Sequence, residues 1–155
     1  MFRPALFSVL LLTLLAPPAG ATPAPSTEID APTLVRNRAA LAKLLGNSGI
    51  TLQWIDWDRR GHLDVRMPGR TLYLDGGQRA ASGPGSLSLQ GRVTEVDATQ
   101  FRFHGRIVIA DTPDVGRNCI RDGDFIFAIT RNRQYWRLQE MEICDGLTDY
   151  VDIYF

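Results

Sequence analysis

The residues best suited to bind a ligand or a partner alternate along the last third of the chain. In RQYWRLQEMEI and LTDYVDIYF, arginine, tyrosine and acidic residues recur at every second position, which puts them on one face of two β-strands. With two arginines of the preceding polar segment they make up the predicted binding face: Arg117, Arg121, Arg137, Gln139, Tyr150, Asp152 and Tyr154. Arginine and tyrosine are frequent anchors of interfaces. The pattern is equally typical of a solvated sheet face with arginine–carboxylate contacts, so both interpretations stay open.

The other groups that could do chemistry match no known catalytic or metal-binding pattern. The two histidines, His62 and His104, lie far apart in the sequence and lack the ligand spacing of a zinc site. The stretch DGD at 122–124 lacks the twelve-residue calcium-loop pattern, and the chain has no nucleophile elbow, P-loop or dinucleotide fingerprint. We therefore predict no catalytic residue, no metal and no cofactor. An enzyme would need a pocket that brings one histidine next to a carboxylate.

The two cysteines of the chain are Cys119 and Cys144. A catalytic thiol would require a histidine partner, and neither cysteine lies in a recognised catalytic motif. In an oxidising compartment, a disulfide is the default state of such a pair. We predict that the two cysteines form a disulfide, which in the chain-entropy model stabilises a fold by roughly 3–4 kcal/mol.

The first residues have the features of an export signal. Arg3 precedes the apolar run ALFSVLLLTLLA, and small residues lead to a cleavage site after Ala21. We predict a signal peptide over 1–21, a flexible linker rich in Pro, Ala, Ser and Thr over 22–32, and a single domain over 33–155. The apolar run is short for a membrane span. We therefore expect a periplasmic or secreted protein with no transmembrane segment after cleavage.

The charge balance argues against one class of partner. The 17 lysines and arginines match the 17 aspartates and glutamates, so the formal net charge is +0. Such a balance gives no support for binding to nucleic acid or to an acidic membrane surface. We expect a monomer whose partner is a small ligand or an envelope protein.

The elements that must position these residues are one helix followed by many short strands. TLVRNRAALAKLLG at 33–46 repeats leucines at helical spacing, with Asp30 as the predicted N-cap and Gly46 as the stop. From residue 50 onwards, runs with alternating apolar residues follow one another between turn residues. We predict a mainly β fold, an antiparallel meander of about eight strands that is strongly curved or closed as a small barrel, with the N-terminal amphipathic helix at an edge or an open end.

Turn residues set the predicted boundaries. The segment 50–57 reads as a strand, GGQRAASGPG at 76–85 as a glycine-rich loop, and DTPDVGRNCIRDGD at 111–124 as a long polar connection. The strands at 86–96 and 101–110 carry apolar residues of matching parity, which puts both sets on one face. Gly91 and Gly105 stand in the middle of these strands, where glycine permits a bulge or sharp coiling.

The chain ends in CDGLTDYVDIYF, which we interpret as a disulfide anchor, a turn and a final core strand. Asp145-Gly146 is typical of a two-residue hairpin turn. With that turn, Trp136 lies opposite Phe155, and a turn at Arg131-Asn132 puts Phe127 opposite Trp136. The predicted core row is then Phe125, Phe127, Ile129, Trp136, Leu138, Val151, Ile153 and Phe155. One pairing is poor, because it sets Glu142 against Asp149.

A terminal phenylalanine preceded by alternating apolar residues also resembles the C-terminal signal of outer-membrane barrels. The strands before residue 86 are too short to span at about nine residues or more, and Asp149 interrupts the apolar face. The sequence therefore favours a core strand over an insertion signal.

The stretches GRNCIRDGDFIF and RQYWRLQEMEICDGLTDYVDIYF resemble the C-terminal half of small, uncharacterised secreted proteins from proteobacteria. The resemblance covers residues 86–155, and the tail is its most specific part. It implies an exported, β-rich domain and brings no activity with it.

The function that fits these observations is an exported binding or interaction module. The alternative is an inhibitor of an exported hydrolase such as a lysozyme, which would use a protruding loop at 76–85 or 111–124. An outer-membrane barrel and an enzyme are less favoured.

Overall fold

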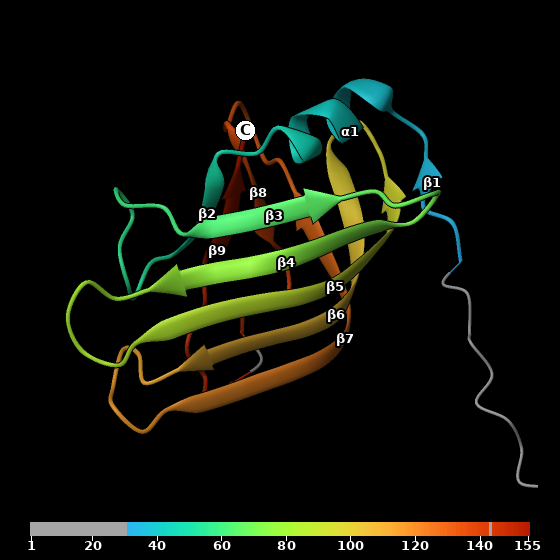
Figure 1. Ribbon diagram of the computed structural model, residues 1–155. Helices are drawn as coiled ribbons and strands as arrows, with labels where there is room; N and C mark the ends of the chain where they lie inside the picture. The colour runs from blue at the N-terminus through green and yellow to red at the C-terminus, as the bar shows by residue number, and fades with distance from the viewer. Residues whose placement is uncertain (1–30, 143) are drawn as a thin grey trace, which may run out of the picture.

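Eight antiparallel strands form one strongly curved, nearly closed sheet in the computed structural model, which describes residues 31–142 and 144–155 (Figure 1). The mainly β fold and the barrel-like closure are therefore confirmed. The strands follow one another around the sheet in the order β2 (Gly49–Leu52), β9 (Val151–Tyr154), β8 (Tyr135–Leu138), β7 (Asn118–Ala128), β6 (Gln100–Ala110), β5 (Ser86–Val96), β4 (Leu72–Arg79) and β3 (His62–Arg66). The predicted signal peptide and most of the predicted linker lie outside the described residues.

The first and last strands of this order meet at Ile50 and Gly61. Their backbones exchange two hydrogen bonds, of 3.1 Å from Ile50 N to Gly61 O and 2.8 Å in return. The side chain of Asn47 donates to the carbonyl of Leu63 on β3, at 3.1 Å. These bonds bring the edges of the sheet together only at one corner, so the barrel is not completely closed.

The helix is shorter than predicted. It spans α1 (Arg38–Leu45), begins at the N-cap Asn37, whose side chain accepts from Ala40 N at 2.9 Å, and ends at the predicted stop, Gly46. The start at residue 33 was wrong, and Asp30 lies outside the described residues. Residues 34–35 instead form β1 (Leu34–Val35), which pairs in parallel with the end of β5. Pairing to the sheet satisfies the backbone hydrogen bonds of residues 34–35, so the helix begins only after the N-cap Asn37.

The core fills the inside of the curved sheet. Alternate residues of each strand point inward, and aromatic rings occupy the end near α1. Phe101 and Phe127 stack with their centroids 5.0 Å apart, and Trp136 meets Phe101 edge-on at 5.7 Å. Lys43 of α1 lies 4.2 Å from the ring of Phe155, beside the C-terminus (Figure 1). Such aromatic pairs add to the stabilisation from burial.

Glycines allow the sharp bend of the long strands. Gly91 of β5 lies opposite Gly105 of β6, which in turn lies opposite Gly123 of β7. The ring of Phe103 packs over the first two, since a Cβ on Gly105 would lie 2.6 Å from Phe103 Cζ and 2.3 Å from the carbonyl oxygen of Gln90. The predicted coiling at Gly91 and Gly105 therefore takes the form of a glycine pair covered by an aromatic ring.

Gly105→Ala should destabilise the domain by about 1–3 kcal/mol, because the new methyl group overpacks the core. Urea unfolding monitored by circular dichroism measures the change. Gly85→Ala is the matched control, because its Cβ would come no closer than 3.3 Å to a neighbouring atom. Equal stabilities of the two variants would contradict this account of the bend.

Three predicted boundaries were wrong. Residues 53–57 leave the sheet after β2, because Ile55 N and Asp56 N both turn back to the carbonyl of Leu52. Conversely, residues 76–79 and 118–124 belong to β4 and β7 and are not loop. Pairing with a long neighbouring strand extended these polar or glycine-rich segments as strands against their local preference. The loops that remain are 80–85 and 111–117.

The register of the last two hairpins differs from the prediction by two residues. Trp136 lies opposite Ile153 instead of Phe155, and Phe127 lies opposite Leu138 instead of Trp136. A shift of two keeps every side chain on its predicted face. The predicted core row is accordingly buried, apart from Ile129 and Phe155, which are partly buried.

The register shifts because β8 ends at Leu138 and the chain leaves the sheet before it turns. The turn at Asp145-Gly146 exists, with φ angles of 60° and 67° and a bond of 3.1 Å from Leu147 N to Cys144 O. It does not connect paired strands. Asp149, predicted to face Glu142, instead contacts Arg117.

The predicted disulfide is present. Cys119 of β7 and Cys144 are bonded, with their Cα atoms 5.8 Å apart. The bond fastens the irregular segment after β8 to the inner side of β7.

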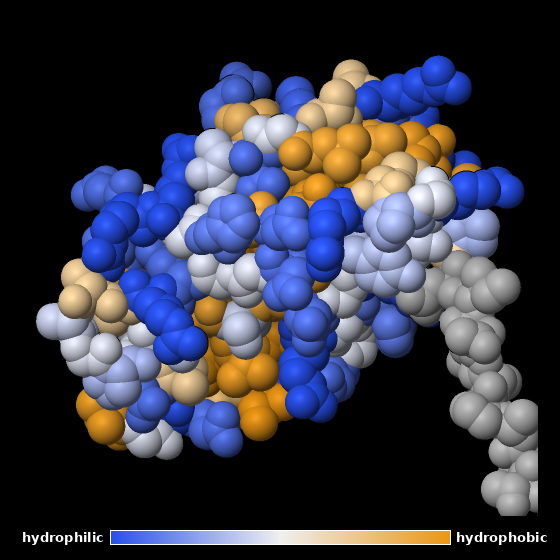
Figure 2. Space-filling view, in the orientation of Figure 1, coloured by the Kyte–Doolittle hydropathy of each residue, from blue (hydrophilic) through white to orange (hydrophobic). Residues whose placement is uncertain are grey.

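The near wall of the sheet, β3 to β7, carries hydrophilic residues and an apolar patch over β5 to β7, and further hydrophobic residues gather around α1 and β1 (Figure 2). Leu34 and Leu45 are the exposed large hydrophobic residues of those two elements. Among the described residues, no helix has the length and apolar character needed to cross a membrane.

Candidate functional site

The outer side of β2, β9 and β8 carries a layer of stacked rings and guanidinium groups. We call it the aromatic–arginine face, and it consists of Trp57, Arg60, Tyr135, Arg137, Tyr150 and Tyr154. Arg60 lies 4.0 Å from the ring centroid of Tyr154, which is 5.2 Å from that of Tyr135. Arg137 lies over Tyr150 at 4.1 Å and over Tyr135 at 5.2 Å. The Arg137 guanidinium thus contacts rings from separate segments of the chain, whereas Arg60 contacts Tyr154.

A buried ion pair supports this layer from below. Arg137 donates from Nε and Nη2 to the two oxygens of Asp152, at 2.7 and 2.6 Å. The side chain of Asp152 is 0% exposed and that of Arg137 is 12% exposed. Burial raises the pKa of the Asp152 carboxyl, and the guanidinium partly offsets that rise. The hydrogen bonds that Arg137 donates to Asp152 in turn raise the pKa of Arg137. A two-bond pair of this kind fixes the orientation of the guanidinium under the rings.

Trp57 joins this face although the sequence did not single it out. Its centroid lies 5.7 Å from the Arg137 guanidinium and 6.5 Å from the ring of Tyr150. Gln53 holds the loop there, because its Nε2 donates to Thr148 O at 2.6 Å and its Oε1 accepts from Tyr150 N. The sequence signal for a turn at this point was Asp56. Its carboxylate accepts from the backbone N–H groups two and three residues later, as in an Asx turn.

The predicted binding residues divide into two groups. Arg137, Tyr150, Asp152 and Tyr154 come together, with Asp152 buried beneath the others. Gln139 lies beside them and donates to the carbonyl of Arg137 at 2.7 Å. Arg117 and Arg121 do not reach this face. A role in binding stays a prediction for all seven.

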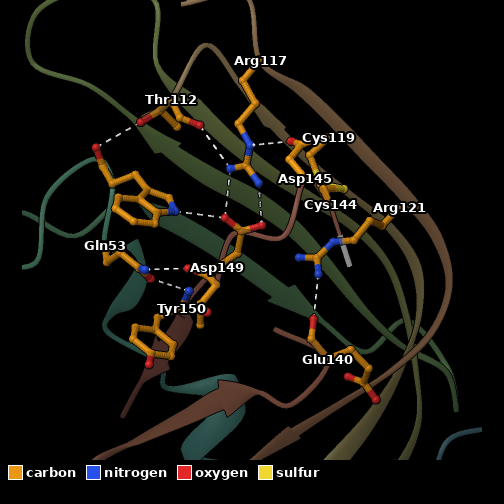
Figure 3. A network of polar contacts seen from close by, with 12 residues as sticks. Gln53, Thr112, Arg117, Cys119, Arg121, Glu140, Cys144, Asp145, Asp149 and Tyr150 are labelled. Atoms are coloured by element: carbon orange, nitrogen blue, oxygen red, sulfur yellow. Dashed lines mark hydrogen bonds and ion pairs between the residues drawn. A yellow bond between two sulfur atoms is a disulfide. The ribbon is translucent and has the colours of Figure 1, made fainter. Parts of the chain in front are cut away.

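Arg117 instead ties loops together at one end of the sheet (Figure 3). It donates to both oxygens of Asp149, at 2.9 and 3.0 Å, and to Thr112 O at 3.2 Å. The indole N–H of Trp54 reaches the same carboxylate at 3.0 Å. The side chain of Arg117 is 6% exposed and that of Asp149 is 0% exposed. The hydrogen bond to Asp149 raises the pKa of Arg117. This network fixes the relative positions of three segments.

These segments border a shallow cleft of about 360 Å³. The loops 54–59, 80–85 and 111–115 line it. Trp54 is 36% exposed on one side, and Val115, which is 77% exposed, protrudes on another. The cleft lies at the same end as the Arg117 network, because Thr112 and Trp54 belong to both.

The histidines lie on the outside of the sheet. His104 Nδ1 is 2.9 Å from Asp124 Oδ1, and both side chains are largely solvent-accessible. His62 is exposed on β3. Within residues 31–142 and 144–155, no group of three or more His, Cys, Asp and Glu side chains is arranged to hold a metal ion.

Comparison with known protein families matches residues 32–155 to the PM1083 family. The chain belongs to the PM1083 family. It is 39% identical over 115 residues to the "Uncharacterized protein PM1083" of Pasteurella multocida (strain Pm70), a match that covers 73% of this chain and 74% of the relative. The family match includes every strand of the sheet and extends well beyond residues 86–155. No solved structure matches the chain.

Proposed function

We propose that this member of the PM1083 family is an exported interaction module that binds an acidic partner protein through the aromatic–arginine face. The observation that carries the proposal is the stack of four aromatic residues with Arg60 and Arg137, in which the buried carboxylate of Asp152 holds Arg137. Tyrosine, tryptophan and arginine are the residue types that dominate interface energetics. Their mutual stacking restricts the rings before binding, which reduces the entropic cost of association.

The charge of the face supports an acidic partner. Arg60, Arg133 and Arg137 surround the rings, with Arg133 5.5 Å from Tyr135. Within the described part of the chain, only Arg137 of these three pairs with a carboxylate. The face is therefore positive although the whole chain has a formal net charge of +0. A partner with a negative patch would be steered towards it.

Two observations support export. The predicted signal peptide over 1–21 would direct the chain out of the cytoplasm. The disulfide between Cys119 and Cys144 would persist in an oxidising compartment. The role proposed is binding and not catalysis.

Photo-crosslinking tests this proposal in the native bacterium. A photoreactive phenylalanine analogue at position 57 should capture one envelope protein, and the analogue at position 104, on the opposite outer face, should not. The purified partner should bind the Trp57→Ala variant about tenfold more weakly. Its affinity for the unmodified chain should fall with increasing salt. Identical products from both positions, or an affinity unaffected by Trp57→Ala, would contradict the proposal.

A second candidate function is inhibition of an exported hydrolase such as a lysozyme, and Val115 favours it. Val115 is 77% exposed on a loop that Asp111 stabilises by accepting from Gly116 N at 2.8 Å. An apolar residue on a fixed, protruding loop can enter an active-site cleft. Lysozyme assays with the wild type and Val115→Asp test this function, and a lack of inhibition by the wild type would exclude the enzymes assayed.

A further inference from the structure

Arg121 points into the interior of the sheet. On β7 the inward positions are Cys119, Arg121, Gly123 and Phe125, and Arg121 is 4% exposed. Its Nη1 donates to the backbone carbonyl of Glu140 at 2.7 Å (Figure 3). Its Nε and Nη2 atoms are buried and have no hydrogen-bond partner within the described residues. A buried polar atom without a partner is rare in folded proteins and calls for an explanation.

The unpartnered atoms form the edge of the guanidinium that binds carboxylates elsewhere in this protein. Arg106 donates from Nε and Nη2 to Asp122 at 2.7 and 3.0 Å, and Arg137 uses the same two atoms on Asp152. The two N–H bonds on that edge are parallel and match the two oxygens of a carboxylate. In Arg121 the same edge is buried and faces no acceptor in the part of the chain described.

Arg121 forms no ion pair with a carboxylate in the described part of the chain, and Asp149 and Glu140 act on its charge only at longer range. Both oxygens of the buried Asp149 carboxylate accept from Arg117 (Figure 3). The carboxylate of Glu140 accepts from Ile126 N at 2.9 Å. Desolvation lowers the pKa of Arg121. The pKa values of Arg117 and Arg137 are instead raised, because each donates hydrogen bonds to a carboxylate. A buried cation without a counter-charge is costly to the fold.

The row of inward side chains is interrupted next to Arg121. Gly123 has no side chain, and a Cβ at this position would have no heavy atom within 4 Å. The neighbouring residue opposite, Gly105, also lacks a side chain. The inward row of β7 therefore has no side chain next to Arg121, and the ring of Phe103 covers the neighbouring position on β6.

We propose that the Nε–Nη2 edge of Arg121 binds the carboxylate group of a small organic acid inside the sheet. The acid supplies the two acceptors that Arg121 lacks and neutralises its charge. This site is separate from the aromatic–arginine face, and its existence does not depend on the proposed partner.

Thermal unfolding in acetate tests the proposal. The full-length exported chain is melted in increasing sodium acetate, with sodium chloride added to keep the ionic strength constant. The wild type should show a rise in Tm of several degrees that saturates. Arg121→Met should lose this response, and it should still fold because an apolar replacement removes the buried charge. Arg106→Met is the matched control and should respond like the wild type.

An equal response of Arg121→Met, or no response of the wild type, would overturn the proposal. Crystals of the wild type grown in acetate give a second measurement that does not depend on any variant. They should show a planar carboxylate on Nε and Nη2 of Arg121, and density for water alone at that edge would overturn the site. A second set of crystals is grown without acetate. Planar density at the same edge that is larger than an acetate ion would show that the site holds the carboxylate end of a larger acid.

Discussion

A chain that ends at Asp152 should fail to fold cooperatively. β9 lies between β2 and β8, so the loss of Ile153–Phe155 removes half of this strand and its pairing with both neighbours. Ile153 is 0% exposed and pairs with Ile50 and Trp136. Loss of one such buried aliphatic or aromatic side chain costs about 2–5 kcal/mol, and small domains have a total stability of about 5–15 kcal/mol. Circular dichroism during heating measures the outcome.

Two milder variants serve as controls for this truncation. Deletion of Phe155 alone should lower the melting temperature and preserve the cooperative transition, because Phe155 is only partly buried, 4.5 Å from the ring of Trp136. Leu45→Ala should have little effect, because Leu45 is 44% exposed. A truncated chain that melts like the wild type would show that β9 is dispensable.

Asp149→Ala should destabilise the domain by about 3–5 kcal/mol, because it leaves the buried guanidinium of Arg117 with only the largely exposed Asp145 as a counter-charge. It also removes the acceptor of the Trp54 indole N–H. Chemical unfolding of the purified, disulfide-bonded protein measures the loss. Fluorescence of Trp54 should change in parallel, because its ring is held by the same carboxylate.

The exposed pair of Arg106 and Asp122 provides the control for this substitution. Both side chains are more than half exposed, so Asp122→Ala should change stability little. The double variant Arg117→Met with Asp149→Leu should regain much of the lost stability, because apolar residues can replace a buried pair. If Asp149→Ala costs no more than Asp122→Ala, the network is not structural.

Some of the site was predictable and some was missed for an identifiable reason. Cys119, Arg121, Gly123 and Phe125 have the parity of one inward row, but the polar composition of 111–124 led to the prediction of a connection. Treated as a strand, the segment would have placed Arg121 in the core. Trp57 was missed because ITLQWIDW alternates like a strand up to residue 57. Only the turn after Leu52 brings the ring of Trp57 against that of Tyr150.

Local pattern determined the fold class, the faces of the strands and the disulfide partners. The first two follow from the two-residue period of a strand, which a register shift of two does not alter, and the disulfide follows from there being two cysteines in the chain. Tertiary structure alone decided which polar residues are buried. Asp152 lies on a polar face and Asp149 interrupts an apolar one in the sequence pattern, yet both are 0% exposed because Arg117, Arg137 and the aromatic rings cover them. Burial of a charged side chain depends on partners that are far away in the sequence, and the local spacing of residues does not reveal these partners.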